Sequence, residues 1–274
     1  MIIAVSDLHL GYEKADKEDF LNFLDGYNPG EISRLVLVGD VFDFWREDNI
    51  NIIKNNKEIL SKISSLNIQE VNYIIGNHDY YLYSLAQRYG IQDGNQYFYG
   101  PFVVSKSLRL EDGGENFYFI HGYELEVFSF SEVMSIDIYE TFSKNMGLSG
   151  DLSGKASSEL WDVIQAGSSI SGKVKDLLEK VPEILLKHPS NSERNVEKLW
   201  DLANSKAARC MYLGMDPEEK LIFGHTHKPC ISNDVVNTGA WMDGKNSYLE
   251  ILDGKMALKN FPGDAEISSC PPTE

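Results

Sequence analysis

Five short clusters of polar residues carry side chains that commonly bind divalent metal ions. In chain order they read SDLH from residue 6, GDVFD from residue 39, GNHD from residue 76, HG from residue 121 and GHTH from residue 224. Carboxylate, imidazole and amide groups are ligands for ions such as Mn²⁺, Fe²⁺ and Zn²⁺. The clusters supply these groups from Asp7, His9, Asp40, Asn77, His121, His225 and His227. Three oxygen-bearing side chains and four imidazoles are too many for one ion and suit two.

Each cluster on its own has an ordinary structural explanation. An aspartate near a strand end is a common turn residue, and Gly, Asn and Asp in GNHD are frequent turn formers. The joint occurrence favours chemistry, because the clusters use every histidine of the chain except His188. The combined pattern therefore indicates a site for two metal ions.

Each cluster follows a segment that is expected to form a buried strand. Apolar runs that begin at residues 2, 34 and 70 lead into the first three clusters, and segments with helical spacing at 16–27 and 52–66 separate them. This alternation predicts parallel strands covered by helices. Ligands bind outside the carboxyl ends of strands in such sheets, so the clusters should meet at one rim. Gly39 would allow a close backbone approach beside Asp40.

The rest of the chain divides into strands, a helical region and further strands. Strand-like runs at 97–121 lead into a mostly helical region, and strand-like runs return after residue 220. Helical spacing is clear at 173–187 and at 195–213. We expect an α/β sandwich of two mixed sheets. Its core segments would be 1–122 and 219–274, around a helical insertion at 123–218, with a loose tail after Pro262.

The overall composition is that of an ordinary soluble globular protein. The 274 residues are 42% hydrophobic and 24% charged, with a formal net charge of −17 at pH 7. This charge argues against nonspecific binding of nucleic acid, which depends on clustered Lys and Arg. No stretch is apolar enough to span a membrane, and the amino terminus lacks the pattern of a secretion signal, so we expect a cytoplasmic protein.

The five clusters match, in order, the signatures of the calcineurin-like metallophosphoesterases, and the chain resembles that family over about residues 1–122 and 219–262. The resemblance implies a four-layer α/β/β/α sandwich with a dinuclear centre of Mn, Fe or Zn, of which Mn is the expected metal. It implies that one ion is held by Asp7, His9, Asp40 and His227, and the other by Asp40, Asn77, His121 and His225. It also implies that His78 is catalytic and that Asp43 orients it.

The chemistry of such a centre follows from its charges. Two cations about 3.5–4 Å apart can clamp a phosphoryl oxygen and lower the pKa of a bridging water, which gives hydroxide near neutral pH. The hydroxide would attack phosphorus in line, while His78 stabilises the transition state or protonates the leaving oxygen. The expected activity is hydrolysis of a phosphodiester or diphosphate bond in a phosphate-containing small molecule or a nucleotide-linked lipid.

Residues around two of the clusters look like one branch of the family. Protein serine/threonine phosphatases carry an arginine at the position of Phe44, which argues against that role here. The run GDVFDFW, Pro229 and the tripeptide GAW at 239–241 resemble the UDP-2,3-diacylglucosamine hydrolases, which cleave a diphosphate bond in a nucleotide-linked lipid. Bacterial members of that branch commonly have arginine at the position of His78 and aspartate at the position of Tyr123.

The helical insertion has two interpretations. It either forms a lid that holds lipid chains and begins with residues 124–134, or it simply packs its apolar faces against the core. A lipid substrate would allow peripheral contact with a membrane surface. The oligomeric state is not indicated by the sequence.

Three alternative functions stay open. A Mre11-like nuclease has similar core motifs, but the lack of basic clusters argues against a polyanionic strand as substrate. A cyclic-nucleotide phosphodiesterase is compatible with the same metal centre. A catalytically inactive scaffold of this fold predicts missing ligands, whereas every matched position is filled here.

Overall fold

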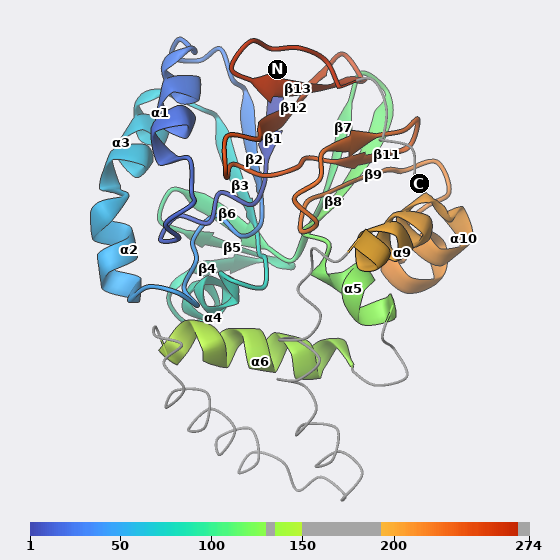
Figure 1. Ribbon diagram of the computed structural model, residues 1–274, viewed down its shortest axis with the longest axis horizontal. Helices are drawn as coiled ribbons and strands as arrows, with labels where there is room; N and C mark the ends of the chain where they lie inside the picture. Colours follow the sequence, from blue (N-terminus) through green and yellow to red (C-terminus); the bar gives the residue numbers. More distant parts are fainter. Residues whose placement is uncertain (130–134, 150–192, 268–274) are drawn as a thin grey trace, which may run out of the picture.

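The computed structural model describes residues 1–129, 135–149 and 193–267, which form two mixed sheets packed face to face (Figure 1). The larger sheet has the strand order β13 (Lys255–Phe261), β12 (Asn246–Leu252), β1 (Ile2–Val5), β2 (Arg34–Val38), β3 (Glu70–Ile74), β6 (Phe102–Ser105), β5 (Gln96–Tyr99), β4 (Ile91–Asp93). The smaller sheet has the order β10 (Cys230–Ile231), β11 (Val235–Asn237), β9 (Lys220–Phe223), β8 (Glu115–Ile120), β7 (Ser107–Asp112). The strands β1, β2, β3 and β6 are parallel, and so are β8, β9 and β11. The parallel strands expected from the sequence are confirmed.

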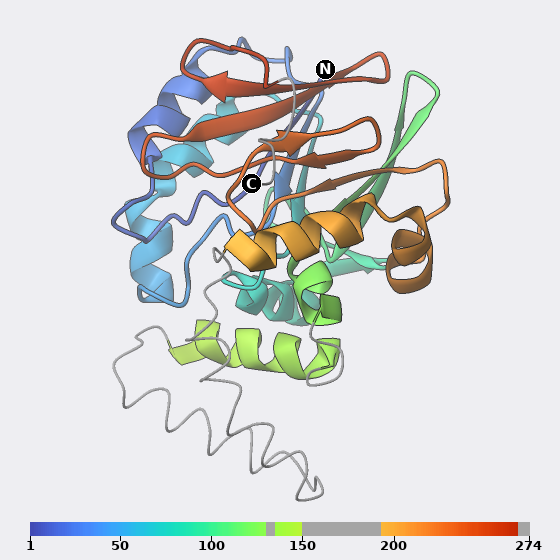
Figure 2. The ribbon, with the colours of Figure 1, turned by 45° about the vertical axis from the view of Figure 1, so that its right-hand side comes forward.

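Helices cover the outer face of each sheet. Figure 1 shows α1 (Lys17–Asp25), α2 (Asn49–Asn55) and α3 (Lys57–Ser65) along the larger sheet. On the other side lie α5 (Tyr123–Ser129), α9 (Glu193–Asn204), the short α10 (Lys206–Ala208) and a π-helical turn at Arg209–Leu213. The helix α6 (Ile136–Ser149) runs below α4 (Tyr80–Tyr89) and α5 in both ribbon views (Figure 2). These helices and sheets form the four-layer sandwich that the sequence predicts.

The alternation of side chains along β2 explains the layering. Val36 and Val38 point between the two sheets, where they join apolar residues of both, such as Ile222. Leu35 and Leu37 point the other way, into the cluster beneath the outer helices. Successive side chains of a strand face opposite sides, so a strand that is apolar at every position needs cover on both faces.

A separate cluster lies on the outer face of the smaller sheet. Leu221 and Phe223 of β9 pack there with Leu125 of α5 and with Leu199 and Ala203 of α9. The helical spacing expected over 195–213 therefore predicts the buried face of α9 correctly. The spacing noted at 173–187 lies outside the described residues.

Two local features differ from the sequence expectation. The helix expected over 52–66 is two helices, α2 and α3, because Asn56 interrupts it and donates from its side chain to the Ile52 carbonyl over 2.8 Å. The chain after Pro262 is held rather than loose as far as Ile267, whose amide donates to the Leu258 carbonyl over 2.8 Å. Tyr248 also donates to Asp264 over 2.7 Å.

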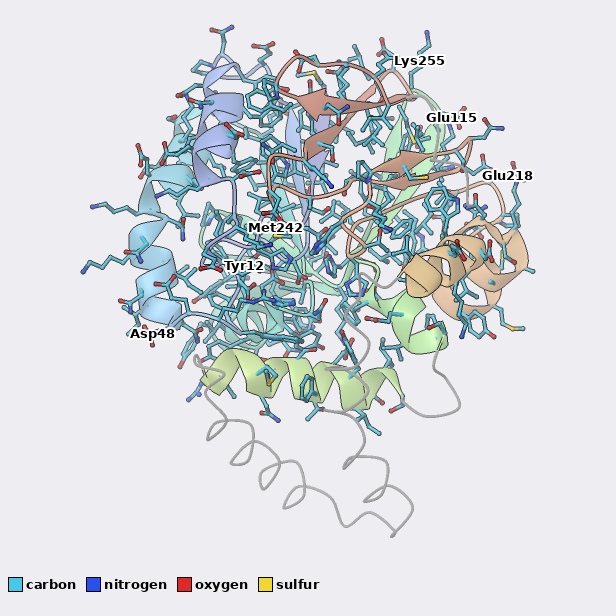
Figure 3. All side chains as sticks on the ribbon, in the orientation of Figure 1. Tyr12, Asp48, Glu115, Glu218, Met242 and Lys255 are labelled. Carbon is cyan, nitrogen blue, oxygen red and sulfur yellow. The ribbon has the colours of Figure 1, made fainter. Side chains whose placement is uncertain are left out.

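The carboxyl ends of β1, β2, β3, β8 and β9 lie at the rim next to α4, α5 and α6. Figure 3 labels Glu115 and Lys255, at the amino ends of β8 and β13, at the opposite edge. The expected clusters therefore gather at one rim. Among the described residues, no helix combines the length and apolar character needed to cross a bilayer.

Candidate metal centre

The expected ligand residues leave their strands through sharp backbone turns. Five of them have left-handed backbone conformations: Asp7 (φ 53°), His9 (φ 45°), Asp40 (φ 52°), His225 (φ 66°) and His227 (φ 57°). This conformation costs a residue with a Cβ atom roughly 1 kcal/mol or more. The Asp7 amide donates to the Gly39 carbonyl over 3.0 Å, and the His9 amide donates to the Asp40 carbonyl over 2.9 Å. The loops after β1 and β2 therefore support each other at the rim.

Glycines beside the clusters let the polar side chains pack against bare backbone. A Cβ atom on Gly39 would lie 2.4 Å from Nδ1 of His121, and one on Gly76 would lie 2.1 Å from Oδ1 of Asp40. Both distances are well inside van der Waals contact, so neither position accepts an alanine without movement. The close approach expected at Gly39 is confirmed, and Gly76 provides the same space beside Asp40.

One group of side chains converges from the loops after β1 and β9. Ligand atoms of Asp7, His9 and His227 all lie within 4.8 Å of one another. Nε2 of His227 is 3.2 Å from Oδ1 of Asp7 and 3.2 Å from Nε2 of His9. Oδ2 of Asp40 lies 3.8 Å from the same His9 nitrogen. Burial lowers the pKa of His227, which favours the neutral imidazole that binds a cation.

A second group lies directly beside the first. Asp40, His121 and His225 form a fully buried set whose ligand atoms again lie within 4.8 Å of one another. Nε2 of His121 is 3.2 Å from Oδ2 of Asp40, while its Nδ1 donates to the Val38 carbonyl over 2.8 Å. A histidine that donates through one ring nitrogen presents the other as a metal ligand. Asp40 is thus close to both groups.

The hydrogen bonding of the expected ligand residues shows whether they suit a cation. Four expected ligand residues each have a buried side-chain atom without a hydrogen-bond partner, namely Oδ1 of Asp7, Oδ1 of Asn77, Nε2 of His121 and Nδ1 of His227, whose Nε2 is the nitrogen near Asp7 and His9. A buried polar atom without a partner costs about 1–3 kcal/mol. Oδ1 of Asp7 lies 3.2 Å from Nε2 of His227, and Nε2 of His121 lies 3.2 Å from Oδ2 of Asp40, yet neither Oδ1 of Asp7 nor Nε2 of His121 forms a hydrogen bond. Such crowding without hydrogen bonds fits ligands that converge on divalent cations.

Protonation of the histidines reflects the crowded carboxylates. Burial lowers the pKa of His9, but its hydrogen bond to Asp43 and the nearby carboxylates of Asp7 and Asp40 outweigh burial and raise the pKa to about 10. Burial also lowers the pKa of His121, but the charges of Asp40 and Asp7 raise it to about 10. In the absence of a cation these two rings therefore hold protons at neutral pH, and a bound cation would displace them.

Asp43 lies at the centre of a further set of contacts. It is fully buried, and its two oxygens contact Nδ1 of His9 at 3.0 Å and Nδ1 of His78 at 2.9 Å. The Arg46 guanidinium donates to the same carboxylate. Trp45 stacks on the His78 ring with centroids 4.1 Å apart and an interplanar angle of 24°. The oxygens of Asp43 are therefore hydrogen-bonded to both histidines, and ligand atoms of His9, Asp43 and His78 also lie within 4.8 Å of one another.

The comparison with known sequence families gives a match over most of the chain. Residues 1–229 match the family described as calcineurin-like phosphoesterase (Metallophos). The chain belongs to this family. Together with the convergent ligand groups, the family identifies the protein as a metal-dependent phosphoesterase that acts on a phosphate-containing substrate. None of the curated proteins matches this calcineurin-like phosphoesterase in sequence.

Several solved structures are similar to this calcineurin-like phosphoesterase at low sequence identity. A dimetal phosphatase from Danio rerio has a TM-score of 0.42 and 12% identity, with 94% of this chain and 95% of that chain covered. Vps29 from Chaetomium thermophilum has a TM-score of 0.41 and 13% identity, with coverage of 100% and 96%. A conserved protein from Streptococcus pneumoniae TIGR4, described as a predicted phosphoesterase, has a TM-score of 0.36 and 14% identity, with coverage of 97% and 95%. The family assignment rests on the sequence match.

Two buried carboxylates near the centre of this phosphoesterase were not expected from the sequence. Asp79, the last residue of GNHD, accepts from the Val41 and Gly76 amides over 2.8 and 2.7 Å and from the Tyr73 hydroxyl over 2.6 Å. Burial and the charge of the neighbouring Asp40 raise the pKa of Asp79 to about 7. The position of Asp79 inside the GNHD cluster could have marked it as a functional residue in the sequence.

The other carboxylate, Glu126, contacts Nε2 of His225 at 2.8 Å. It comes from α5, which begins directly after His121 and Gly122. A single glutamate in an amphipathic segment carries no comparable signal in the sequence.

Proposed function

We propose that this calcineurin-like phosphoesterase hydrolyses a phosphodiester or diphosphate bond with two divalent cations, of which Mn²⁺ is the expected metal. The observation that supports this most strongly is the set of buried ligand atoms that lack hydrogen-bond partners. One ion would be held by Asp7, His9, Asp40 and His227, and the other by Asp40, Asn77, His121 and His225. When bound, the ions would polarise a phosphoryl oxygen and lower the pKa of a water molecule.

His78 is the residue that we propose to meet the leaving oxygen. Asp43 is hydrogen-bonded to Nδ1 of the His78 ring, which leaves Nε2 of that ring for the substrate. The His78 amide donates to Oδ1 of Asp40 over 2.8 Å and so fixes the residue beside the centre. Stacking by Trp45 restricts rotation of the ring. A proton held at Nε2 would pass to the leaving oxygen as the bond to phosphorus breaks.

We further propose a nucleotide-diphosphate-linked lipid as the substrate class. Its support is the resemblance of GDVFDFW, Pro229 and GAW to the UDP-2,3-diacylglucosamine hydrolases. Phe44, at the position of the phosphatase arginine, is buried and stacks with Phe42 at a centroid distance of 5.7 Å, so it offers no group to a phosphomonoester. Helices after the HG cluster expose the apolar residues Leu148 and Met211, which an acyl chain could contact.

The test is an activity panel with purified protein loaded with Mn²⁺. The substrates are a nucleotide-diphosphate lipid, a cyclic nucleotide, single-stranded DNA and a phosphomonoester. We expect selective turnover of the lipid diphosphate. The His78→Ala variant should bind two ions as the original protein does and lose about 10²–10⁴-fold in kcat.

Each part of the proposal has its own contrary result. Selective cleavage of DNA or of the cyclic nucleotide would exclude the lipid diphosphate and favour the corresponding alternative. Undiminished turnover by His78→Ala would exclude its role at the leaving oxygen. Failure to turn over any substrate with two ions bound would favour a non-catalytic scaffold.

A further inference from the structure

A carboxylate from α5 reaches the buried histidine that follows β9. Oε2 of Glu126 lies 2.8 Å from Nε2 of His225. The two residues are only 5% and 3% exposed, so water cannot substitute for either partner. The metal-facing group on this side comprises Asp40, His121 and His225, and Glu126 stands behind the last of these.

We infer that Glu126 is a positioning residue that fixes which nitrogen of His225 faces the metal. This inference rests on the proposed dinuclear site. A carboxylate accepts the proton of an imidazole N–H, so the contact places that proton on Nε2 of His225. Nδ1 then carries the lone pair of the ring and is the nitrogen left for a metal ion. A carboxylate behind a histidine ligand also raises the basicity of the ring and restricts its orientation.

His225 is held in place from more than one direction. Its backbone amide donates to Oδ2 of Asp7 over 2.9 Å, and its ring lies edge-on to the His121 ring with centroids 5.1 Å apart. Neither contact selects a ring nitrogen. Within the described part of the chain, Glu126 is the partner that does so.

Glu126 also links the centre to α6. Burial raises the pKa of the Tyr139 hydroxyl well above its ordinary value, and the charge of the nearby Glu126 carboxylate adds to the increase. Tyr139 therefore stays protonated beside the Glu126 carboxylate. Glu126 on α5 is thus near both His225 and Tyr139 of α6. Helices that follow the HG cluster thus contribute to the metal centre without supplying a ligand.

Glu124 provides a matched control on the same helix. Its carboxylate accepts from the Gly122 amide over 2.9 Å, and burial raises its pKa. It lies near the charges of His121 and His225 but has no hydrogen bond to either ring in the described structure. Replacement of Glu124 by Gln removes a nearby charge without touching the ring nitrogen of His225.

The experiment measures metal binding rather than turnover. Metal-free protein is titrated with Mn²⁺ or Zn²⁺ against a chromophoric chelator, for the original chain and for Glu126→Gln, Glu126→Ala and Glu124→Gln. We expect one of the two ions to bind about 10–100-fold more weakly to Glu126→Ala, while the other keeps its affinity. Glu126→Gln keeps an acceptor oxygen in nearly the same shape and should lose less. Glu124→Gln should match the original chain.

The outcomes separate this inference from the proposed function. Equal affinity of Glu126→Ala and the original chain for both ions overturns the role of Glu126 and leaves the dinuclear centre standing. Equal weakening of both ions with a lower Tm indicates a merely structural role and also overturns it. If Glu126→Ala does not fold, the near-isosteric Glu126→Gln decides by the same comparison. An original chain that binds fewer than two ions overturns the centre and this inference together.

Discussion

Replacement of Gly76 by alanine tests how tightly the backbone packs against Asp40. The added Cβ atom would lie 2.1 Å from Oδ1 of Asp40 and 2.4 Å from its backbone nitrogen. Ordinary contacts of Cβ atoms begin near 3.4 Å. Rotation of the Asp40 side chain relieves only the first clash, because the second involves the main chain. Either the GNHD turn or the loop after β2 therefore has to move by about 1 Å.

The size of the effect follows from this displacement. A shift of about 1 Å in a group that positions a reaction costs on the order of 100-fold in rate. Asp40 lies beside both ligand groups, so we expect kcat/KM to fall by about that factor and metal stoichiometry to fall as well. Overpacking costs about 1–3 kcal/mol, which lowers Tm by about 2–12 °C in a chain of this size.

The control is Gly26→Ala, at a glycine with an ordinary backbone conformation. Its added Cβ atom has a nearest contact of 3.2 Å, to the Phe23 carbonyl oxygen. We expect this variant to keep its activity and its metal content. The measurements are metal content after gel filtration, calorimetric Tm and turnover of the best substrate in the panel. Two bound ions and unchanged turnover in Gly76→Ala would show that Asp40 is not held where the structure has it.

Four further predictions concern protons and positioning. Asp43→Asn should weaken metal binding about 10–100-fold, because His9 loses the carboxylate behind its ring; chelator competition measures this. The pKa values of His9 and His121 are raised to about 10 in the metal-free fold, so its unfolding free energy should fall as pH rises from about 7 through 10. Calorimetry in buffers of different ionisation enthalpy should show about two protons released on metal loading at neutral pH. Trp45→Ala should lower kcat without changing metal content, because the His78 ring loses its stacking partner and Trp45 is not an expected ligand; constant kcat would contradict this.

Much of the fold could be predicted because its core strands are short and apolar at every position. The run that contains Val36 and Leu37 needs cover on both faces, and the structure provides it with a second sheet and a helical layer. The break at Asn56 could not be predicted, because it depends on a buried side chain that bonds to the backbone of its own helix. Helical spacing continues across the break and conceals it.

The candidate site divides in the same way. The expected ligands follow strand ends, and four of them adjoin a glycine, which are features of local sequence. The structure brings Asp7 and His227 together from distant parts of the chain. Their roles as ligands stay a prediction. The contact between Glu126 and His225 joins residues 99 positions apart, and neither carries a local mark of the pairing. Such positioning contacts become visible only when the helices are docked.

Asp43 gives one carboxylate two tasks. It stands behind His9 in the candidate metal centre and behind His78 at the proposed leaving-group position. A change in the charge of Asp43 therefore alters two properties together. These are the electron density that His9 offers to a cation and the acidity of His78. The two properties therefore cannot be adjusted separately by changes at position 43. Selection for a new leaving group would have to act through other neighbours of His78, such as Trp45.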